Sequence, residues 1–287
     1  MTLPEPAVAA AYLDSCLAEL AALKPGNVHL FAGGHGMTTA DFEASARASA
    51  PVMGRHDLSV GERILGAIEA TRSVVDCNTN LGIVLLCAPL ATAAMQAGGG
   101  LRDRLRQILD NLDIADAQRA FAAIRLAEPG GLGDAPEHDV RRPATVSLRA
   151  AMEAARDRDR IARQYATAFA DVFEMGMPAY RAAGERWQSG NWAATATYLE
   201  FLAAFPDTLV ARKSGLAAAD RVRAAARPLA ARLRSAADPA TLTTDLLAFD
   251  DELKTAGRNP GTSADLTVAS LFAVRLEDAL GAATSLW

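Results

Sequence analysis

Apolar residues recur at helical spacing along the whole 287-residue chain, and no segment alternates apolar and polar residues as a half-buried strand does. Alanine, leucine, arginine and glutamate are frequent and β-branched residues are sparse, which favours helix over sheet. The sequence contains no fixed-period repeat. We therefore expect an all-α, multi-helix bundle that forms one domain over residues 1–287. The predicted helices are residues 6–23, 39–53, 60–76, 80–97, 101–109, 113–127, 144–175, 178–189, 192–204, 208–235, 239–256 and 263–283.

Local signals refine two of these helices. Ser59 followed by Glu62 has the spacing of a capping box, so a helix is expected to begin directly after Ser59. Residues 81–97 are almost entirely apolar, but Pro89 and Gln96 interrupt them and they fall short of the roughly 20 apolar residues that span a bilayer. This segment is expected to be a buried core helix and not a membrane anchor.

The charge balance and the cysteines bear on the class of partner and on the compartment. The net charge is −5, and no basic block or tail is present, so nucleic acid is not an expected partner. Cys16, Cys77 and Cys87 share no metal-like spacing and form no even set, which favours reduced thiols. The first fifteen residues lack the basic and apolar regions of a signal peptide. A cytoplasmic protein is therefore expected.

Polar loops interrupt the apolar pattern at four places, and they have a common character. Asp76, Asn78 and Asn80 lie directly before a nearly unbroken apolar run, where polar groups are costly unless they are paired. The other loops carry lysine, arginine, histidine, aspartate or asparagine at helix ends: residues 24–35, 207–213 and 259–265. Free N–H groups at helix starts and nearby cations suit phosphate, and carboxylate and amide oxygens suit Mg²⁺. These parts together indicate a Mg²⁺–polyphosphate site walled by helices.

Each of these polar residues also has an ordinary structural explanation. Thr262 and Asp265 have the spacing of a capping box, and Asp207 is a plausible N-cap residue. Lys24, near a helix C-terminus, would complement the helix dipole. His29 and His35 could be loop histidines without a ligand, and Glu69 could be a surface carboxylate.

Five short motifs, taken together and in order, resemble the ATP:dephospho-CoA triphosphoribosyltransferase family. Each motif is weak alone, but the five cover almost the whole chain: KPGNVH at 24–29, HGMTTADFEAS at 35–45, residues 63–80 with their Asn78-Thr79 pair, PDTLVARKSG at 206–215 and NPGTSADLTVASLF at 259–272. The family makes the prosthetic-group precursor of citrate and malonate lyases or decarboxylases.

The resemblance implies an all-α fold, Mg²⁺, ATP as substrate, and a CoA-like acceptor. It implies transfer of the 5′-triphosphoribosyl group of ATP to the 2′-hydroxyl of dephospho-CoA, with release of adenine. It also implies roles for residues. Mg²⁺ binding or general-base catalysis would fall to three carboxylates, Glu69, Asp207 and Asp265. Binding of the nucleotide and its phosphates would involve Lys24, His29, His35, Asn78, Thr79, Asn80, Arg212 and Lys213.

Two departures from the family pattern leave the acceptor open. Members that act in citrate lyase maturation read NTHKG where this chain reads NTNLG, so a basic pair is replaced by Asn80 and Leu81. His29 stands where those members commonly have aspartate. Residues 138–166 resemble instead a branch found in archaea and in bacteria that use archaeal-type one-carbon carriers. An ATP-dependent step on a methanopterin- or methanofuran-like carrier is therefore an alternative.

Two further possibilities concern assembly and class. A non-catalytic helical scaffold or binding protein would have no need to gather its polar loops at one pocket, so the positions of those loops discriminate it from an enzyme. The apolar final helix, residues 263–283, could pair with a second copy, which makes a homodimer possible.

Overall fold

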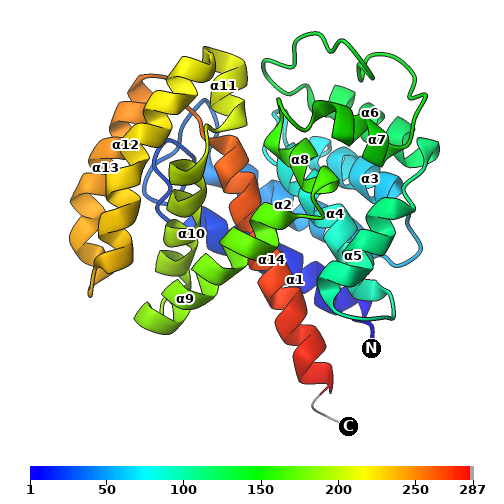
Figure 1. Cartoon of the computed structure of the whole chain (residues 1–287), viewed down its shortest axis with the longest axis horizontal. Coiled ribbons are helices and arrows are strands. Elements are labelled where there is room, and N and C mark those ends of the chain that lie inside the picture. Colours follow the sequence, from blue (N-terminus) through cyan, green and yellow to red (C-terminus); the bar gives the residue numbers. More distant parts are fainter. Residues whose placement is uncertain (285–287) are drawn as a thin grey trace.

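The chain is all-α, as its sequence pattern predicts. The structure is a computed structural model that describes residues 1–284, in which no β-strand occurs (Figure 1). The first eight helices are α1 (Glu5–Ala21), α2 (Thr39–Gly54), α3 (Val60–Arg72), α4 (Leu81–Met95), α5 (Leu101–Asp110), α6 (Ile114–Ala127), α7 (Leu148–Ala155) and α8 (Arg160–Ala166). A π-helical turn, η1 (Val172–Gly176), leads into α9 (Met177–Trp187), which is followed by α10 (Gly190–Ala204), α11 (Thr208–Ser214), α12 (Leu216–Ser235), the 3₁₀ turn η2 (Pro239–Leu242), α13 (Thr243–Thr255) and α14 (Gly261–Thr284).

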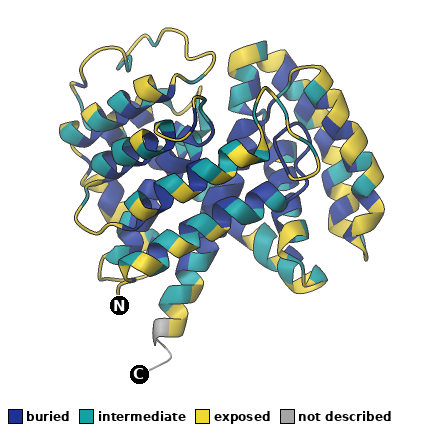
Figure 2. Ribbon diagram, turned by 180° about the vertical axis from the view of Figure 1, so that it is seen from behind, coloured by how far each residue is buried: buried dark blue, intermediate teal, exposed yellow. Residues whose placement is uncertain are grey.

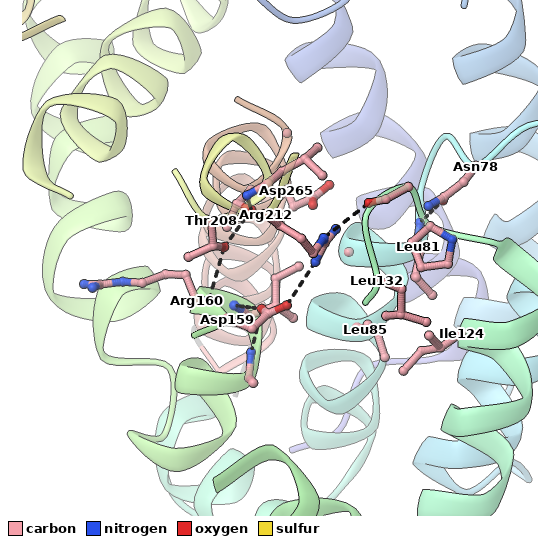
Figure 3. A pocket seen from close by; sticks show the side chains of 18 of the residues that line it. Asn78, Leu81, Leu85, Ile124, Leu132, Asp159, Arg160, Thr208, Arg212 and Asp265 are labelled. Carbon is pink, nitrogen blue, oxygen red and sulfur yellow. Dashed lines mark hydrogen bonds and ion pairs between the residues drawn. The ribbon is translucent and has the colours of Figure 1, made fainter. Parts of the chain in front are cut away.

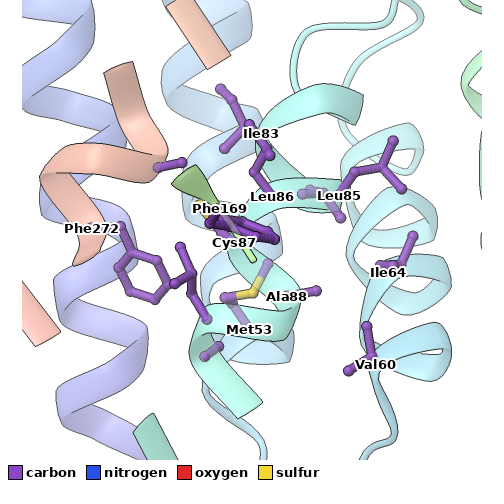
Figure 4. Packing of buried hydrophobic residues seen from close by; sticks show 14 of the residues in the cluster. Met53, Val60, Ile64, Ile83, Leu85, Leu86, Cys87, Ala88, Phe169 and Phe272 are labelled. Carbon is purple, nitrogen blue, oxygen red and sulfur yellow. The ribbon is translucent and has the colours of Figure 1, made fainter. Parts of the chain in front are cut away.

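Two apolar helices form the centre of the molecule. α4 is apolar on all sides, so it is stable only where neighbours cover it completely, and most of its residues are buried. α14 packs against α1, α4 and α10. Figure 4 shows this core, in which Leu86 and Cys87 of α4, Phe272 of α14 and Met53 of α2 belong to one cluster of buried side chains. Figure 2 shows buried residues along these central helices and exposed ones on the outer helices.

Packing within the chain accounts for the apolar character of α14. Leu266, Val268, Leu271 and Phe272 are fully buried by neighbouring helices of the same chain. The apolar helix therefore gives no separate argument for a homodimer, which stays a prediction. Among residues 1–284, no helix combines the length and the low polarity that crossing a bilayer requires.

The local signals at helix ends were partly correct. Ser59 and Glu62 form the predicted capping box, because each side chain accepts a hydrogen bond from the other residue's backbone N–H. The predicted box of Thr262 and Asp265 is wrong, since α14 begins at Gly261 and the Thr262 hydroxyl accepts instead from the backbone N–H of Leu209 (3.2 Å).

Two of the predicted helices were too long. The segment 144–175 is divided, because Asp159 caps a new helix by accepting from the backbone N–H groups of Ile161 (2.8 Å) and Ala162 (3.3 Å). The segment 208–235 is divided at Gly215, whose φ of +86° suits glycine and ends α11. Both breaks lie close to the cavity described next, since α8 begins beside it and α11 lines it along most of its length.

Candidate active site

A cavity of about 900 Å³ lies where most of the polar loops meet. We call it the cleft. Its wall is formed by the loop between α3 and α4, the start of α4, the loop between α6 and α7, the segment between α7 and α8, α11, and the start of α14. Its volume is within the range of cofactor and substrate sites. Segments far apart in the sequence thus contribute to one site.

One side of the cleft is polar. Arg212 of α11 reaches Oδ2 of Asp159 (3.4 Å) and donates to the carbonyl of Gly130 (3.3 Å), as Figure 3 shows. The Thr208 hydroxyl accepts from the backbone N–H of Arg160 (3.3 Å) and is bonded to the Thr262 hydroxyl (3.0 Å). These bonds connect α8, α11 and α14 along this wall.

The facing side is apolar. Leu81 and Leu85 of α4 lie opposite the polar wall, together with Ile124 of α6 and Leu132 of the following loop (Figure 3). Leu81 and Leu85 are almost fully buried, whereas Leu132 is 39% exposed and lies in the loop between α6 and α7. The cleft therefore offers polar contacts to one part of a ligand and apolar contacts to another.

Asp265 is a carboxylate without a protein partner. In residues 1–284 its side chain makes no hydrogen bond or ion pair, yet it lines the cleft. It occupies space that only glycine leaves: a Cβ on Gly82 of α4 would lie 2.0 Å from Oδ2 of Asp265. Burial and the negative charges of nearby carboxylates raise the pKa of Asp265 well above its ordinary value. The site is thus poised to receive a cation or a hydrogen-bond donor.

The loop between α3 and α4 contributes three neighbouring residues to the cleft, Asn78, Thr79 and Asn80. The Asn78 side chain caps α4 by accepting from the N–H of Leu81 (3.1 Å). The Thr79 hydroxyl is bonded to that of Ser45 (2.6 Å). The Asn80 amide nitrogen donates to Thr71 (2.8 Å), while its buried Oδ1 has no partner in the described part of the chain. Asn80 therefore has an acceptor available for a ligand or a water molecule.

A buried ion pair lies beside the cleft. The ammonium of Lys24 is fully buried and contacts Oε1 of Glu19 and Oδ1 of Asn27 (3.2 Å). Asn27 in turn donates to Oδ1 of Asn259 (2.8 Å), which joins the KPGN and NPG motifs directly. Glu19, Asn27 and Asn259 line the cleft, but Lys24 does not. Lys24 is thus separated from a ligand by its own protein partners.

Asp207 performs a structural task. It is fully buried, and its two oxygens accept four hydrogen bonds, from the N–H groups of Leu209 (3.0 Å) and Val210 (3.1 Å) and from the N–H and hydroxyl of Ser263 (both 2.8 Å). Burial raises its pKa, while these bonds oppose the change. The same bonds occupy backbone N–H groups at the starts of α11 and α14, which we had expected to be free for phosphate.

The remaining expected site residues are divided between the cleft and other places. His35 lines the cleft, and its ring bonds to the carbonyl of Gly26 (2.9 Å). His29 is buried behind that loop, 3.2 Å from Asp250, and burial lowers its pKa. Glu69 is exposed on α3 and does not line the cleft.

Several cations face the cleft without a carboxylate partner among residues 1–284. Lys213 and Arg163 make no ion pair there, and Arg158 donates only to the backbone carbonyl of Ala154 (3.3 Å). Sequence reasoning named Lys213 but missed both arginines, because it placed residues 144–175 in one continuous helix. The unpaired cations create a positive region on the polar wall.

Protein residues alone do not form a metal site. In residues 1–284, no group of three or more histidine, cysteine or acidic side chains is arranged to hold a metal ion. Mg²⁺, however, usually keeps several waters and is bound by one or two carboxylates plus substrate phosphates. The unpaired Asp265 fits such a metal, brought in by a phosphate-bearing substrate.

Comparisons with known proteins agree with the motif pattern. The profile of one family, described as CitG, ATP:dephospho-CoA triphosphoribosyl transferase, matches residues 5–284. Among solved structures, the chain is similar to the crystal structure of a candidate triphosphoribosyl-dephospho-CoA synthase from Archaeoglobus fulgidus. The TM-score is 0.64 and the identity 25%, over 82% of this chain and 98% of that one. No curated protein matches the chain closely enough to add to this comparison. The chain therefore belongs to the ATP:dephospho-CoA triphosphoribosyl transferase family and is an ATP-using transferase.

Proposed function

We propose that the protein is a Mg²⁺-dependent transferase that moves the 5′-triphosphoribosyl group of ATP to the 2′-hydroxyl of a CoA-like acceptor and releases adenine. The observation that carries the proposal is the division of the cleft into a cationic, polar wall and an apolar wall, with an unpaired carboxylate, Asp265, between helices. The cationic, polar wall suits a triphosphate, and the apolar wall suits an acceptor with an uncharged arm.

The triphosphate is assigned to the polar wall. Arg212 and Lys213 stand at the end of α11, and Arg158 and Arg163 flank the start of α8. Arginine forks suit phosphate oxygens. Lys213, Arg158 and Arg163 are available without breaking an ion pair among residues 1–284, whereas Arg212 would exchange its contact with Asp159 for a phosphate. Asp265 would hold Mg²⁺, which would neutralise part of the triphosphate charge.

The protein contributes charge stabilisation and positioning to the displacement at C1′. As the bond to adenine lengthens, positive charge develops on the ribose. Glu19 and Asp159 line the cleft beside Asp265 and add negative potential there; after burial, their charges contribute to the raised pKa of Asp265. Such a fixed potential favours the transition state over the neutral ground state. Holding both substrates in one cleft adds the advantage of orientation.

Leu81 in the apolar wall affects which acceptor the cleft can bind. Leu81 is part of the apolar wall, at the position where the family members named above carry lysine. An apolar residue there favours an acceptor that presents fewer negative charges to this wall. The resemblance of residues 138–166 to the archaeal-type branch keeps a one-carbon carrier of the methanopterin or methanofuran type as the alternative acceptor.

Incubation with Mg-ATP and each acceptor tests the proposal. We expect the acceptor mass to increase by one triphosphoribosyl group and adenine to appear in equal amount. If ATP binds but no acceptor gains mass, the proposal is refuted. Modification of a carrier but not of dephospho-CoA would retain the chemistry and reassign the acceptor.

A further inference from the structure

Glu19 is a buried glutamate that has one side on the cleft and the other on a fixed cation. It lies in α1, is 3% exposed, and lines both the cleft and a cavity of about 10 Å³ behind it. Its Oε1 contacts the ammonium of Lys24, and no second protein partner for its carboxylate occurs in residues 1–284. One oxygen is therefore held, while the other is available to a group in the cleft.

Lys24 is arranged to hold this carboxylate and not to bind a ligand. Its side chain is fully buried, its contacts are Glu19 and Asn27, and it does not line the cleft. Asn27 is itself fixed by Asn259 (2.8 Å). Gly26, whose φ is +83°, lies so close to Leu253 and Pro260 that a Cβ would be 2.9 Å from their atoms. The turn that follows Lys24 is therefore tightly packed, and Lys24 itself is held by Glu19 and Asn27.

We propose that Glu19 is the general base that accepts the proton of the acceptor hydroxyl, and that Lys24 is the positioning residue that orients it. The inference rests on the proposed function, since it requires a hydroxyl nucleophile. It differs from the roles expected from the sequence, in which Lys24 contacts the triphosphate and Glu19 has no part.

The step balances without a further reactant. The hydroxyl proton moves to the free carboxylate oxygen of Glu19 while the hydroxyl oxygen forms a bond to C1′ of the ATP ribose. The C1′–N9 bond breaks, and its electron pair leaves with adenine, which takes a proton from water. Glu19 then returns its proton to water. Burial raises the pKa of Glu19, with Lys24 opposing, and a base that titrates nearer neutrality is a more effective one.

A buried ion pair also has a purely structural reading, and a double variant separates the two. Glu19→Gln or Lys24→Met alone leaves a buried partner uncompensated, which destabilises the fold. The double variant removes both charges, and such replacements are often neutral or stabilising. A structural pair would therefore lose activity in each single variant and regain it in the double variant. If Glu19 is the general base, the double variant stays inactive.

The experiment measures adenine release with saturating acceptor, the affinity for Mg-ATP without acceptor, and Tm. For Glu19→Gln/Lys24→Met we expect a Tm near that of the wild type, an ATP affinity within about threefold, and a loss in kcat of at least about a hundredfold. Lys24→Met alone should lower kcat and leave KM for ATP nearly unchanged. Glu185→Gln, an exposed change on α9, is the matched control and should match the wild type.

Three results would overturn the inference. A double variant that retains more than about a tenth of wild-type kcat shows that Glu19 is not the base. If Lys24→Met raises KM for ATP without lowering kcat, Lys24 binds the triphosphate and does not position Glu19. If the wild type binds ATP but releases no adenine with any acceptor, the proposed function fails and the base assignment fails with it. The wild-type measurement thus distinguishes the two failures.

Discussion

Replacing Asp265 by asparagine should stabilise the protein while it abolishes activity. The carboxylate has no protein partner in residues 1–284, and Glu19, Asp207 and Asp159 add like charges. Leaving a buried polar group unsatisfied costs about 1–3 kcal/mol, and more when the group is charged. Asparagine keeps the shape but removes the charge, so we expect a gain of about 1 kcal/mol. For a chain of this size, that is an increase of about 2 °C in Tm.

The pH dependence of this gain has a definite sign. The pKa of Asp265 is raised in the folded state, so the folded protein binds the proton more tightly than the unfolded chain does. The contribution of protonated Asp265 to the free energy of unfolding is therefore fully present below its unfolded-state pKa of about 3.9. It is lost as the pH rises through the pKa of Asp265 in the folded protein. The Tm advantage of Asp265→Asn should be small near pH 4 and should grow toward neutral pH.

The assay is thermal unfolding without ligands across this pH range, followed by adenine release at neutral pH. Asp251→Asn, an exposed change on α13, is the control and should alter neither quantity. We expect a loss in kcat of at least about a hundredfold in Asp265→Asn. A lower Tm at neutral pH would refute the reasoning about unpaired charge. Retained activity would remove Asp265 from the site.

Three further predictions follow from the same geometry. Gly82→Ala should lower activity at least tenfold with a change in stability of no more than about 2 kcal/mol, because the new methyl displaces Asp265; unchanged kinetics would contradict this. Asp207→Ala should lower the free energy of unfolding by at least about 2 kcal/mol, since four hydrogen bonds are lost, and urea unfolding measures it. Glu69→Gln should leave steady-state kinetics unchanged, and a loss of activity would return Glu69 to the catalytic set.

Much of the fold was accessible from the sequence because its signals are local. The apolar run of α4 and the capping box at Ser59 each depend on residues within one or two turns. The two predicted helices that were too long are broken between Ala155 and Arg160 and at Gly215. The Asp159 cap and the positive φ of Gly215 mark these breaks in a pattern that otherwise continues. Propensity alone does not register such a break.

The site was accessible only in part because its bonds are long-range. The segments that carry His35, Asn78, Arg212 and Asp265 do meet at one cleft. Asp207, however, was expected to face a ligand, whereas Ser263, 56 residues away in the sequence, takes its second oxygen. An aspartate that binds a ligand and an aspartate that caps a helix both stand at a helix start. No local sequence pattern therefore distinguishes the two roles.

Glu19 was missed although a signal was present. It falls on the same helical stripe as Tyr12, Cys16 and Leu20, all of which are buried in α1. A glutamate on an apolar stripe needs a partner or a function. Lys24, five residues later, was the natural candidate for the partner.

The identity of the purine released from ATP tests the central claim most directly. With Mg-ATP and a competent acceptor, the protein should release adenine in equal amount to modified acceptor, with no ADP or AMP. Formation of ADP or AMP coupled to acceptor modification would mean that the cleft transfers a phosphoryl or adenylyl group, and would contradict the account.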